Sequence, residues 1–310
     1  MANKKVFIDG KAGTTGLRIY ERLESFEGIE LITLSDEKRK DPVARKEALN
    51  SADIAFLCLP DDAARESVSL IENDSTVVID TSTAHRTLDD WAYGFPELSL
   101  NHREKLKNSK RIAVPGCHAS GFIALVFPLI EAGAIDADTN LACFSLTGYS
   151  GGGKKMIGEY EEEPDVLLGA PRQYGLTQNH KHLKEMVKIT GLKSSPAFSP
   201  VVGNFYSGME VTVPVFKSDL KNGFDLEKIK ELYKSKYTGP LVNYSDESED
   251  GFLSAGILSG KDSMVVSVYG NEDRILLVAR YDNLGKGASG AAVECLNIVL
   301  GNEDICGLEI

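Results

Sequence analysis

The chain is poor in the residues that mark disulfide-rich and metal-binding proteins. Its 310 residues include five cysteines, five histidines and one tryptophan. The cysteines are odd in number and contain no C-x-x-C pair, a pattern that fits neither a disulfide framework nor a zinc site. We therefore expect no bound metal, and any chemistry of Cys or His must rest on individual residues.

Long apolar runs and an excess of positive charge are also missing. The longest apolar run, residues 122–130, is far shorter than the roughly 20 residues that span a bilayer, and residues 1–8 contain no signal-peptide core. Lys and Arg number 34 against 46 Asp and Glu, which gives a net charge of −12. We expect a cytoplasmic protein without a nucleic-acid or membrane partner, whose anionic ligands are held by local donors such as helix N-termini.

What is present indicates two domains. The length and the 42% hydrophobic content are enough for two separate cores. In the first third of the chain, strand-like apolar segments alternate with helical ones, which predicts an α/β fold with a Rossmann-like, doubly wound parallel sheet. The expected strands are residues 6–9, 29–34, 53–59, 76–80 and 112–114.

The pattern changes after residue 139, where alternating and β-branched apolar residues predict an α+β domain with a mainly antiparallel mixed sheet. The expected strands are 140–147, 208–216, 263–269 and 274–281, and the expected helices are 180–189 and 226–236. Small residues open a last helix, which would pack back on the first domain. We therefore expect a nucleotide-binding domain of residues 1–116 and 284–310, interrupted by an inserted domain of residues 117–283.

A glycine loop, Gly10-Lys-Ala-Gly13-Thr-Thr-Gly16, lies between the first expected strand and the first expected helix. Glycines at this spacing permit a tight turn and let a pyrophosphate approach the backbone at the helix N-terminus. The alternative is a glycine-rich turn that binds no ligand.

The end of the second strand bears on the choice of cofactor. An acid such as Asp36 would hold the ribose hydroxyls of NAD, whereas Ser35 and Arg39 suit the additional phosphate of NADP. We favour NADP; the alternative is a solvated charged turn. Three further residues after strand ends are expected near the cofactor: Leu59, Pro60 and Ser82.

The segment 112–125 is typical of a nucleophile. A short apolar strand meets a Pro115-Gly116 turn, and a helical run follows Cys117. If the helix starts near His118, Cys117 occupies its N-cap, where the helix dipole stabilises a thiolate. The alternative is a buried cysteine that acts as a small hydrophobe. Arg86, after another strand end, is a candidate for an anionic substrate group or for a surface ion pair.

Two segments of the second half carry candidate chemistry. Tyr149-Ser-Gly-Gly-Gly-Lys154-Lys155 offers backbone amides and lysines to a phosphate, unless it is merely a flexible loop. His180-Lys-His182-Leu-Lys-Glu185 carries two histidines, and either is a candidate base. Glu185 is on the helix face of His182 and favours that residue, while the i, i+2 spacing argues against a metal site.

Four motifs resemble N-acetyl-gamma-glutamyl-phosphate reductase in its compact form. They are Val-Pro-Gly-Cys-His-Ala-Ser-Gly at 114–121, Thr-Gly-Tyr-Ser-Gly-Gly-Gly-Lys at 147–154, His-Lys-His-Leu-Lys-Glu at 180–185 and Asn-Leu-Gly-Lys-Gly-Ala-Ser-Gly at 283–290. The resemblance runs over essentially the whole chain. It implies a relationship with aspartate-semialdehyde and glyceraldehyde-3-phosphate dehydrogenases. It also implies NADP(H) as cofactor, a role in arginine biosynthesis and a homodimer or homotetramer.

The resemblance assigns roles to both parts of the chain. Residues 1–116 and 284–310 would bind NADP, and residues 117–283 would hold substrate and form the oligomer. Cys117 would attack the acyl phosphate, hydride would reduce the thioester, and His180 or His182 would move protons. The expected cofactor-binding residues are Gly10, Ala12, Gly13, Thr14, Thr15, Gly16, Ser35, Arg39, Leu59, Pro60, Ser82, Asn283 and Gly287. The expected substrate-binding residues are Arg86, Ser120, Ser150, Gly151, Lys154, Arg172 and Glu185.

Two other readings remain open on the sequence alone. An aspartate-semialdehyde dehydrogenase would use the same acyl-phosphate chemistry on a smaller substrate, but would place its base in a different sequence context. A non-catalytic NADP-binding regulator would keep the fold, although here the nucleophile and the candidate bases are intact.

Overall fold

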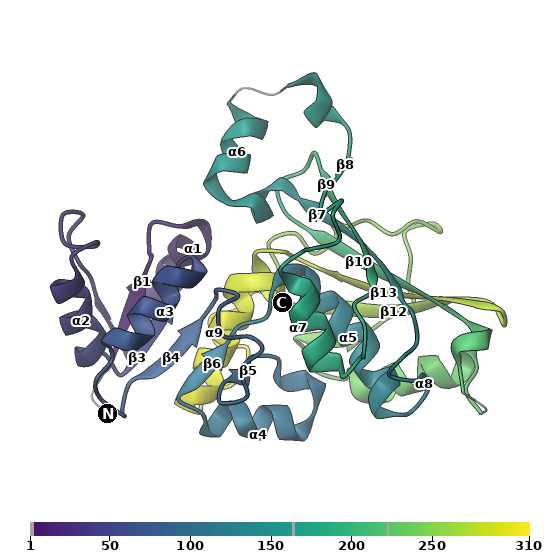
Figure 1. The fold of residues 1–310 in the computed structure, drawn as a ribbon, viewed down its shortest axis with the longest axis horizontal. Helices are drawn as coiled ribbons and strands as arrows, with labels where there is room; N and C mark the ends of the chain where they lie inside the picture. The colour runs from purple at the N-terminus through teal and green to yellow at the C-terminus, as the bar shows by residue number, and fades with distance from the viewer. Residues whose placement is uncertain (1–2, 163–164, 222) are drawn as a thin grey trace. The chain divides into compact units, whose positions relative to one another are not determined.

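The computed structural model describes residues 3–162, 165–221 and 223–310. The chain divides into two compact units. The first contains residues up to 116 together with 288–308, and the second contains residues 117–287 together with 309–310 (Figure 1). Each unit is built around its own sheet.

The first unit contains a six-stranded sheet of order β2-β1-β3-β4-β6-β5, in which every pairing is parallel. Its strands are β1 (Lys4–Asp9), β2 (Ile29–Ile32), β3 (Ile54–Leu57), β4 (Val77–Asp80), β5 (Ala92–Tyr93) and β6 (Arg111–Ala113). The register aligns Asp9 with Leu57, Leu57 with Asp80 and Asp80 with Ala113. These residues end their strands at one edge, where ligands of such sheets bind.

Helices cover both faces of this sheet, as the doubly wound prediction requires. They are α1 (Thr14–Glu24), α2 (Pro42–Ser51), α3 (Asp61–Leu70), α4 (Leu100–Asn108) and α9 (Gly290–Leu300). Alternate residues of β1 separate the two cores: Val6 packs with α1 and α9, whereas Phe7 packs with α2 and α3. The predicted Rossmann-like fold is confirmed.

The second unit contains a seven-stranded mixed sheet of order β11-β12-β13-β10-β7-β9-β8. Its strands are β7 (Ala142–Gly148), β8 (Arg172–Gln173), β9 (Ala197–Gly203), β10 (Met209–Phe216), β11 (Val242–Tyr244), β12 (Met264–Gly270) and β13 (Arg274–Tyr281). The pairs β7–β9 and β11–β12 are parallel and the other four are antiparallel. This arrangement confirms the predicted mixed sheet.

The helices of the second unit are α5 (Cys117–Glu131), α6 (Gly153–Glu161), α7 (His182–Thr190) and α8 (Leu226–Lys236). Short 3-10 turns lie at Pro96–Leu98 in the first unit and at Tyr149–Gly152, Val166–Gly169 and Lys217–Asp219 in the second. A π-helical turn spans Gly285–Ser289. Helix α5 packs directly on β10, because Gly121 has no side chain: a Cβ there would lie 2.6 Å from Cγ2 of Val211. This close contact fixes α5, the helix that begins at Cys117, on one face of the sheet.

Candidate active site

The candidate nucleophile Cys117 is the first residue of α5, so the helix begins one residue earlier than predicted and Cys117 is not its N-cap. The consequence for the thiol is the same, because the positive end of the helix dipole acts on the whole first turn. Cys117 is partly buried, whereas Cys143 and Cys295 are fully buried. Burial raises the pKa of Cys58 to about 12 and also raises the pKa of Cys143, as expected of inert structural thiols.

Tyr281, which the sequence did not single out, holds the first turn of α5. Its hydroxyl donates to the carbonyl oxygen of Cys117 and accepts a 3.0 Å hydrogen bond from the amide of Gly121. Its side chain is fully buried. Gly287 approaches the nucleophile from the π-helical turn, since a Cβ there would lie 3.2 Å from Cβ of Cys117. The backbone of the nucleophile is thus fixed from two sides.

A cluster of three histidines lies beside the nucleophile. His118 is the residue after Cys117, and its ring centroid lies 5.7 Å from that of His180 and 5.6 Å from that of His182. The ring centroids of His180 and His182 are 4.8 Å apart. Its Nδ1 lies 2.6 Å from Oγ of Ser145 and its Nε2 lies 2.6 Å from Oη of Tyr174. The fold therefore brings both predicted bases next to the residue that follows the nucleophile.

Burial keeps His118 and His180 neutral near pH 7. It lowers the pKa of His118 to about 3, and a positive charge on His180 would lower it further. Burial, together with the charge of Lys181, also lowers the pKa of His180. Burial raises the pKa of Tyr174, and the charge of the Cys117 thiolate adds to that shift. Near pH 7 the two histidines are therefore neutral imidazoles and Tyr174 is a neutral phenol.

These shifts predict that stability falls as the pH drops below 6.5. The unfolded chain binds protons at its histidines near pH 6.5, whereas folded His118 stays neutral until about pH 3. Well above pH 6.5 neither the folded nor the unfolded chain protonates His118, so this residue costs no stability there. Between pH 6 and 5 the free energy of unfolding falls by about 1 kcal/mol for each histidine that protonates only in the unfolded chain. Urea unfolding at pH 7.5, 6 and 5 measures this loss. His118→Gln should flatten the dependence, because it removes the group that protonates only in the unfolded chain.

The two predicted bases differ in their surroundings. Helix α7 begins at His182, so His180 precedes the helix and is not its first residue as predicted. The amide of His182 donates to Nδ1 of His180 over 3.3 Å, which leaves the proton of a neutral His180 on Nε2. His182 is buried, and the buried Glu185 follows it by three residues on the same helix.

The predicted phosphate-binding loop is a 3-10 turn, Tyr149–Gly152, which continues into α6. Ser150 is buried and accepts a 3.0 Å hydrogen bond from Nδ2 of Asn283, while Oδ1 of Asn283 accepts from the amide of Gly208. A Cβ on Gly151 would lie 3.5 Å from the same Nδ2. Ser150 and Asn283, which were predicted to contact substrate and cofactor respectively, thus bind each other.

Other predicted substrate-binding residues occupy different parts of the second unit. Ser120 is buried in the first turn of α5. Lys154 is exposed on the first turn of α6. Arg172, on β8, donates to Oη of Tyr160 over 3.1 Å, and its guanidinium lies 5.4 Å from that ring.

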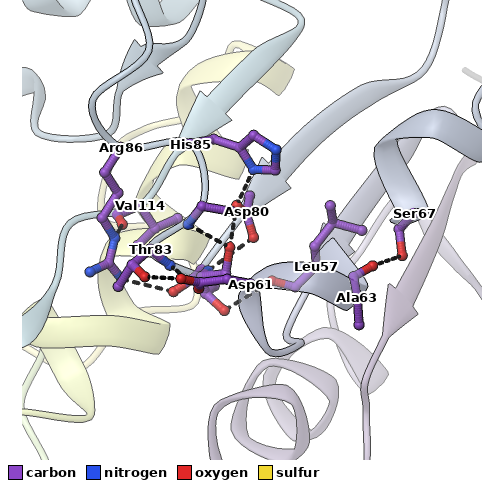
Figure 2. A network of polar contacts seen from close by, with 12 residues as sticks. Leu57, Asp61, Ala63, Ser67, Asp80, Thr83, His85, Arg86 and Val114 are labelled. Atoms are coloured by element: carbon purple, nitrogen blue, oxygen red, sulfur yellow. Dashed lines mark hydrogen bonds and ion pairs between the residues drawn. The ribbon is translucent and has the colours of Figure 1, made fainter. Parts of the chain in front are cut away.

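Arg86 lies in the first unit and is buried, so the surface ion pair considered for it is wrong. Its Nε donates to the carbonyl oxygen of Val114 and its second terminal nitrogen donates to that of Thr81, both over 2.8 Å (Figure 2). Val114 precedes Cys117 by three residues. Arg86 therefore braces the chain that leads into the nucleophile turn.

Figure 2 shows the polar network that surrounds Arg86. Asp80, at the end of β4, accepts from Oγ of Ser82 over 2.7 Å and lies 2.6 Å from Nδ1 of His85. The His85 ring is stacked on Trp91 at 4.0 Å. The hydroxyl of Ser82, a predicted cofactor ligand, is thus engaged with Asp80.

A cavity of about 720 Å³ lies within the first unit, between the glycine loop and the residues after β2. Five predicted cofactor residues line it: Gly10, Ala12, Ser35, Arg39 and Leu59. Five other predicted cofactor residues are not part of its lining but lie in the glycine loop, in the first turn of α1 or directly before α3: Gly13, Thr14, Thr15, Gly16 and Pro60. Lys40 and Arg45 also line it and were missed by the prediction.

The glycine loop is shaped for close approach. Gly10 has φ +89°, and a Cβ there would lie 2.3 Å from the carbonyl oxygen of Cys58. A Cβ on Gly16 would lie 2.5 Å from the carbonyl oxygen of Gly10. The loop leads into α1, whose N-terminal amides suit a pyrophosphate. This fits the predicted dinucleotide.

A buried ion pair adjoins the same cavity. Arg45 donates to Oδ2 of Asp9 from Nε over 3.2 Å and from a terminal nitrogen over 3.1 Å, and it also bonds Ser67 and Glu66. The Ser67 hydroxyl donates to the same carboxylate oxygen. The charge of Asp9, directly before the glycine loop, is thereby balanced.

The described ranges contain neither a metal-ligand cluster nor a membrane-spanning helix. No three side chains among His, Cys, Asp and Glu gather there as metal ligands would. None of the helices in those ranges is both long enough and apolar enough to cross a bilayer.

Comparisons with known proteins match both units. Residues 5–109 match the family model of the semialdehyde dehydrogenase NAD binding domain, and residues 117–283 match that of the semialdehyde dehydrogenase dimerisation domain. N-acetyl-gamma-glutamyl-phosphate reductase 2 of Nostoc is 45% identical over 322 residues, covering 99% of this chain and 100% of the relative. The N-acetyl-gamma-glutamyl-phosphate reductase of Brucella ovis is 44% identical over 306 residues, with coverage of 96% and 99%.

Solved structures share the fold at lower identity. Aspartate semialdehyde dehydrogenase II of Vibrio cholerae superposes with a TM-score of 0.74 at 17% identity, covering 97% of this chain and 99% of that chain. Aspartate semialdehyde dehydrogenase of Candida albicans, solved with NADP, gives a TM-score of 0.68 at 15% identity, with coverage of 96% and 99%. At these identities the likeness concerns the fold alone.

Proposed function

Because the chain belongs to the N-acetyl-gamma-glutamyl-phosphate reductase family, we propose that it catalyses the reductase reaction of arginine biosynthesis. In that reaction NADPH reduces N-acetyl-gamma-glutamyl phosphate to N-acetylglutamate 5-semialdehyde, and phosphate is released. The resemblance inferred from four motifs is thereby confirmed at the level of the family. The observation that carries the proposal is the partly exposed Cys117 at a helix N-terminus, followed directly by His118, whose ring packs against His180 and His182.

Cys117 forms the covalent intermediate in this mechanism. Its thiolate attacks the acyl carbon, the bond from that carbon to the phosphate oxygen breaks, and a thioester forms as phosphate leaves. The nicotinamide cofactor, when bound, supplies the hydride that reduces the thioester carbon. The oxygen of the resulting thiohemiacetal is deprotonated as the carbon–sulfur bond breaks, which releases the aldehyde and restores the thiol.

His182 is the base that we assign to these proton transfers. The proton on Nε2 of neutral His180 makes that ring a hydrogen-bond donor, since its Nδ1 accepts from the amide of His182. His182 begins α7, and Glu185 lies three residues later on the same face of that helix. His180 then acts as the donor that stabilises the substrate oxygen, so both candidates have a role.

The cofactor that we assign to the cavity is NADPH. Ser35, Arg39 and Lys40 line its wall, and the Asp36 side chain, 98% exposed, is ion-paired with Arg39 at 3.6 Å. Asp36 lines the same cavity, where Arg39 offsets its charge, and the two cations Arg39 and Lys40 suit the additional phosphate of NADPH.

Arg39→Ala is expected to raise KM for NADPH about tenfold, the loss expected for one charged hydrogen bond, while KM for NADH changes little. Steady-state kinetics with both cofactors measures the difference. Lys46→Ala, which removes a cation of the same unit outside the cavity, is the matched control. An equal loss for both cofactors would mean that Arg39 does not contact the distinguishing phosphate.

Self-association is proposed through the sheet face opposite α5. Phe144 on β7 and Leu276 on β13 are 55% and 43% exposed, although both lie in paired strands. The match to a dimerisation domain over residues 117–283 covers both residues and supports this face as the contact surface. Phe144→Glu is expected to convert a dimer or tetramer to monomer in sedimentation velocity, and a monomeric wild type would refute the proposal.

The reverse reaction tests the function. We expect phosphate-dependent reduction of NADP with N-acetylglutamate 5-semialdehyde, and little with aspartate semialdehyde. Preference for aspartate semialdehyde would instead assign the chain to that dehydrogenase activity. Tight NADP binding with no turnover of either aldehyde would indicate a non-catalytic protein.

A further inference from the structure

We infer that His118 is a positioning residue that docks the segment carrying both candidate bases onto the nucleophile helix, through its hydrogen bond to Tyr174. The inference rests on the proposed function, because it assigns His180 and His182 to catalysis. It extends that function by naming a neutral histidine and a tyrosine that act together without touching the reacting atoms.

The first observation is the position of His118. It follows the nucleophile directly in the first turn of α5, and its side chain is only 3% exposed. Both ring nitrogens are engaged, one with Ser145 and one with Tyr174, each at 2.6 Å. A neutral imidazole has one donor and one acceptor, so the ring is locked in orientation by two different hydroxyls.

The second observation is the chain that Tyr174 belongs to. Residues 174–181 connect β8 to α7; they carry His180 and lead directly to His182, the first residue of α7. The amide of Tyr174 donates to the carbonyl oxygen of Pro200, which fixes the start of the segment on β9. The Gln178 side chain bonds the main chain of Phe198 twice, donating over 2.7 Å and accepting over 2.9 Å.

Gln178 has φ +58°, a conformation that a side-chain-bearing residue adopts only when its surroundings enforce it. The segment is therefore held on β9 at two points. The Tyr174 hydroxyl connects this fixed segment to α5, and so to the nucleophile.

The third observation is that His118 occupies the centre of the cluster. Its ring lies edge-on to His180, with an interplanar angle of 82°, and edge-on to Phe198 at 5.4 Å. The same ring contacts His182. Any rotation of His118 would therefore displace both candidate bases relative to Cys117, and misplacement by about 1 Å can cost about 100-fold in rate.

His118 is unsuited to be the base itself. Both its nitrogens are committed to protein hydroxyls, and its ring stays neutral throughout the physiological range because it is buried. Its role is accordingly geometric. The raised pKa of Tyr174 keeps the phenol protonated, so the bond to His118 persists at alkaline pH.

Tyr174→Phe is the informative variant, because it removes one oxygen and keeps the ring. We expect kcat to fall about 10- to 100-fold with KM for NADPH unchanged, and Cys117 to react about tenfold more slowly with iodoacetamide at pH 7. His118→Gln should show the same pattern. The double variant should be no worse than His118→Gln alone, because the two side chains act as a unit.

Tyr237→Phe is the matched control. Its buried hydroxyl also bonds α5, donating to the carbonyl oxygen of Ala124 over 2.7 Å, two turns away from Cys117. This variant should lose stability while kcat and the alkylation rate stay at the wild-type values. Wild-type kcat and alkylation in Tyr174→Phe would overturn the inference, as would equal losses in Tyr237→Phe.

The alkylation measurement separates this inference from the proposed function, because it needs neither substrate nor cofactor. A protein inactive toward both aldehydes whose Cys117 still reacts more slowly in Tyr174→Phe would refute the function and retain the docking role. Circular dichroism establishes that each variant is folded. Should His118→Gln fail to fold, Tyr174→Phe alone decides the question.

Discussion

Cys117→Ala is expected to abolish phosphate-dependent NADP reduction, by at least about 10⁴-fold in kcat, because the covalent route has no other nucleophile. The thiol lies at the start of α5, where the helix dipole favours the thiolate, and Tyr281 and Gly287 fix its backbone. The reverse reaction measured at saturating aldehyde gives the loss. NADP affinity should be unchanged, since the cavity is built from the first unit.

Cys306→Ala is the control for this experiment. Cys306 is exposed and lies in the first unit, so its removal should leave kcat within twofold of the wild-type value. A Cys117→Ala protein that kept more than about one hundredth of the wild-type rate would rule out the thioester mechanism and point to direct hydride transfer to the acyl phosphate.

The fold was predictable where the hydrophobic pattern is local. In the first third of the chain, the alternation of strand-like and helical segments predicted the parallel sheet. Helix α8 spans the predicted residues 226–236, because the spacing of its apolar residues and the N-cap Asp225 indicate the same bounds. Helix α2 was missed because it follows a charged run, although Asp41 caps it and Pro42 opens it. Strand β9 was missed because it contains Pro200, which argues against a strand in a sheet interior.

The site was predictable only in part, because much of it depends on contacts between distant residues. Cys117, His180 and His182 stand out by residue type and context. Tyr281 does not, since its bond to Cys117 spans 164 positions of the chain. His118 was visible only as the start of a helix.

Tertiary contacts also give hydrogen-bond partners to residues that the sequence did single out. Arg86 suits an anion by its chemistry, but its donors hold two main-chain carbonyls. Ser150 and Asn283 were assigned to different ligands and prove to bond each other across 133 positions. Residue type predicts what a side chain can bind, whereas burial and tertiary contacts decide what it does bind.

His182→Asn is expected to lower kcat by about 10²- to 10⁴-fold, the range for loss of a general base, whereas His180→Asn should cost only about tenfold. The reason is the tautomer of His180: its Nδ1 accepts from the backbone amide of His182, so a neutral His180 carries its proton on Nε2 and acts as a hydrogen-bond donor. Rates in both directions on the two variants measure the difference, with circular dichroism and thermal unfolding as the checks on folding.

The pH dependence adds a second criterion. Burial lowers the pKa of His180, so a rate that depended on neutral His180 would begin to fall only at pH values below 6.5. If His182 is the base, His180→Asn should retain the wild-type acid limb and His182→Asn should lose it. A larger loss in His180→Asn, together with disappearance of the limb in that variant, would reverse the assignment and make His180 the base that serves Cys117.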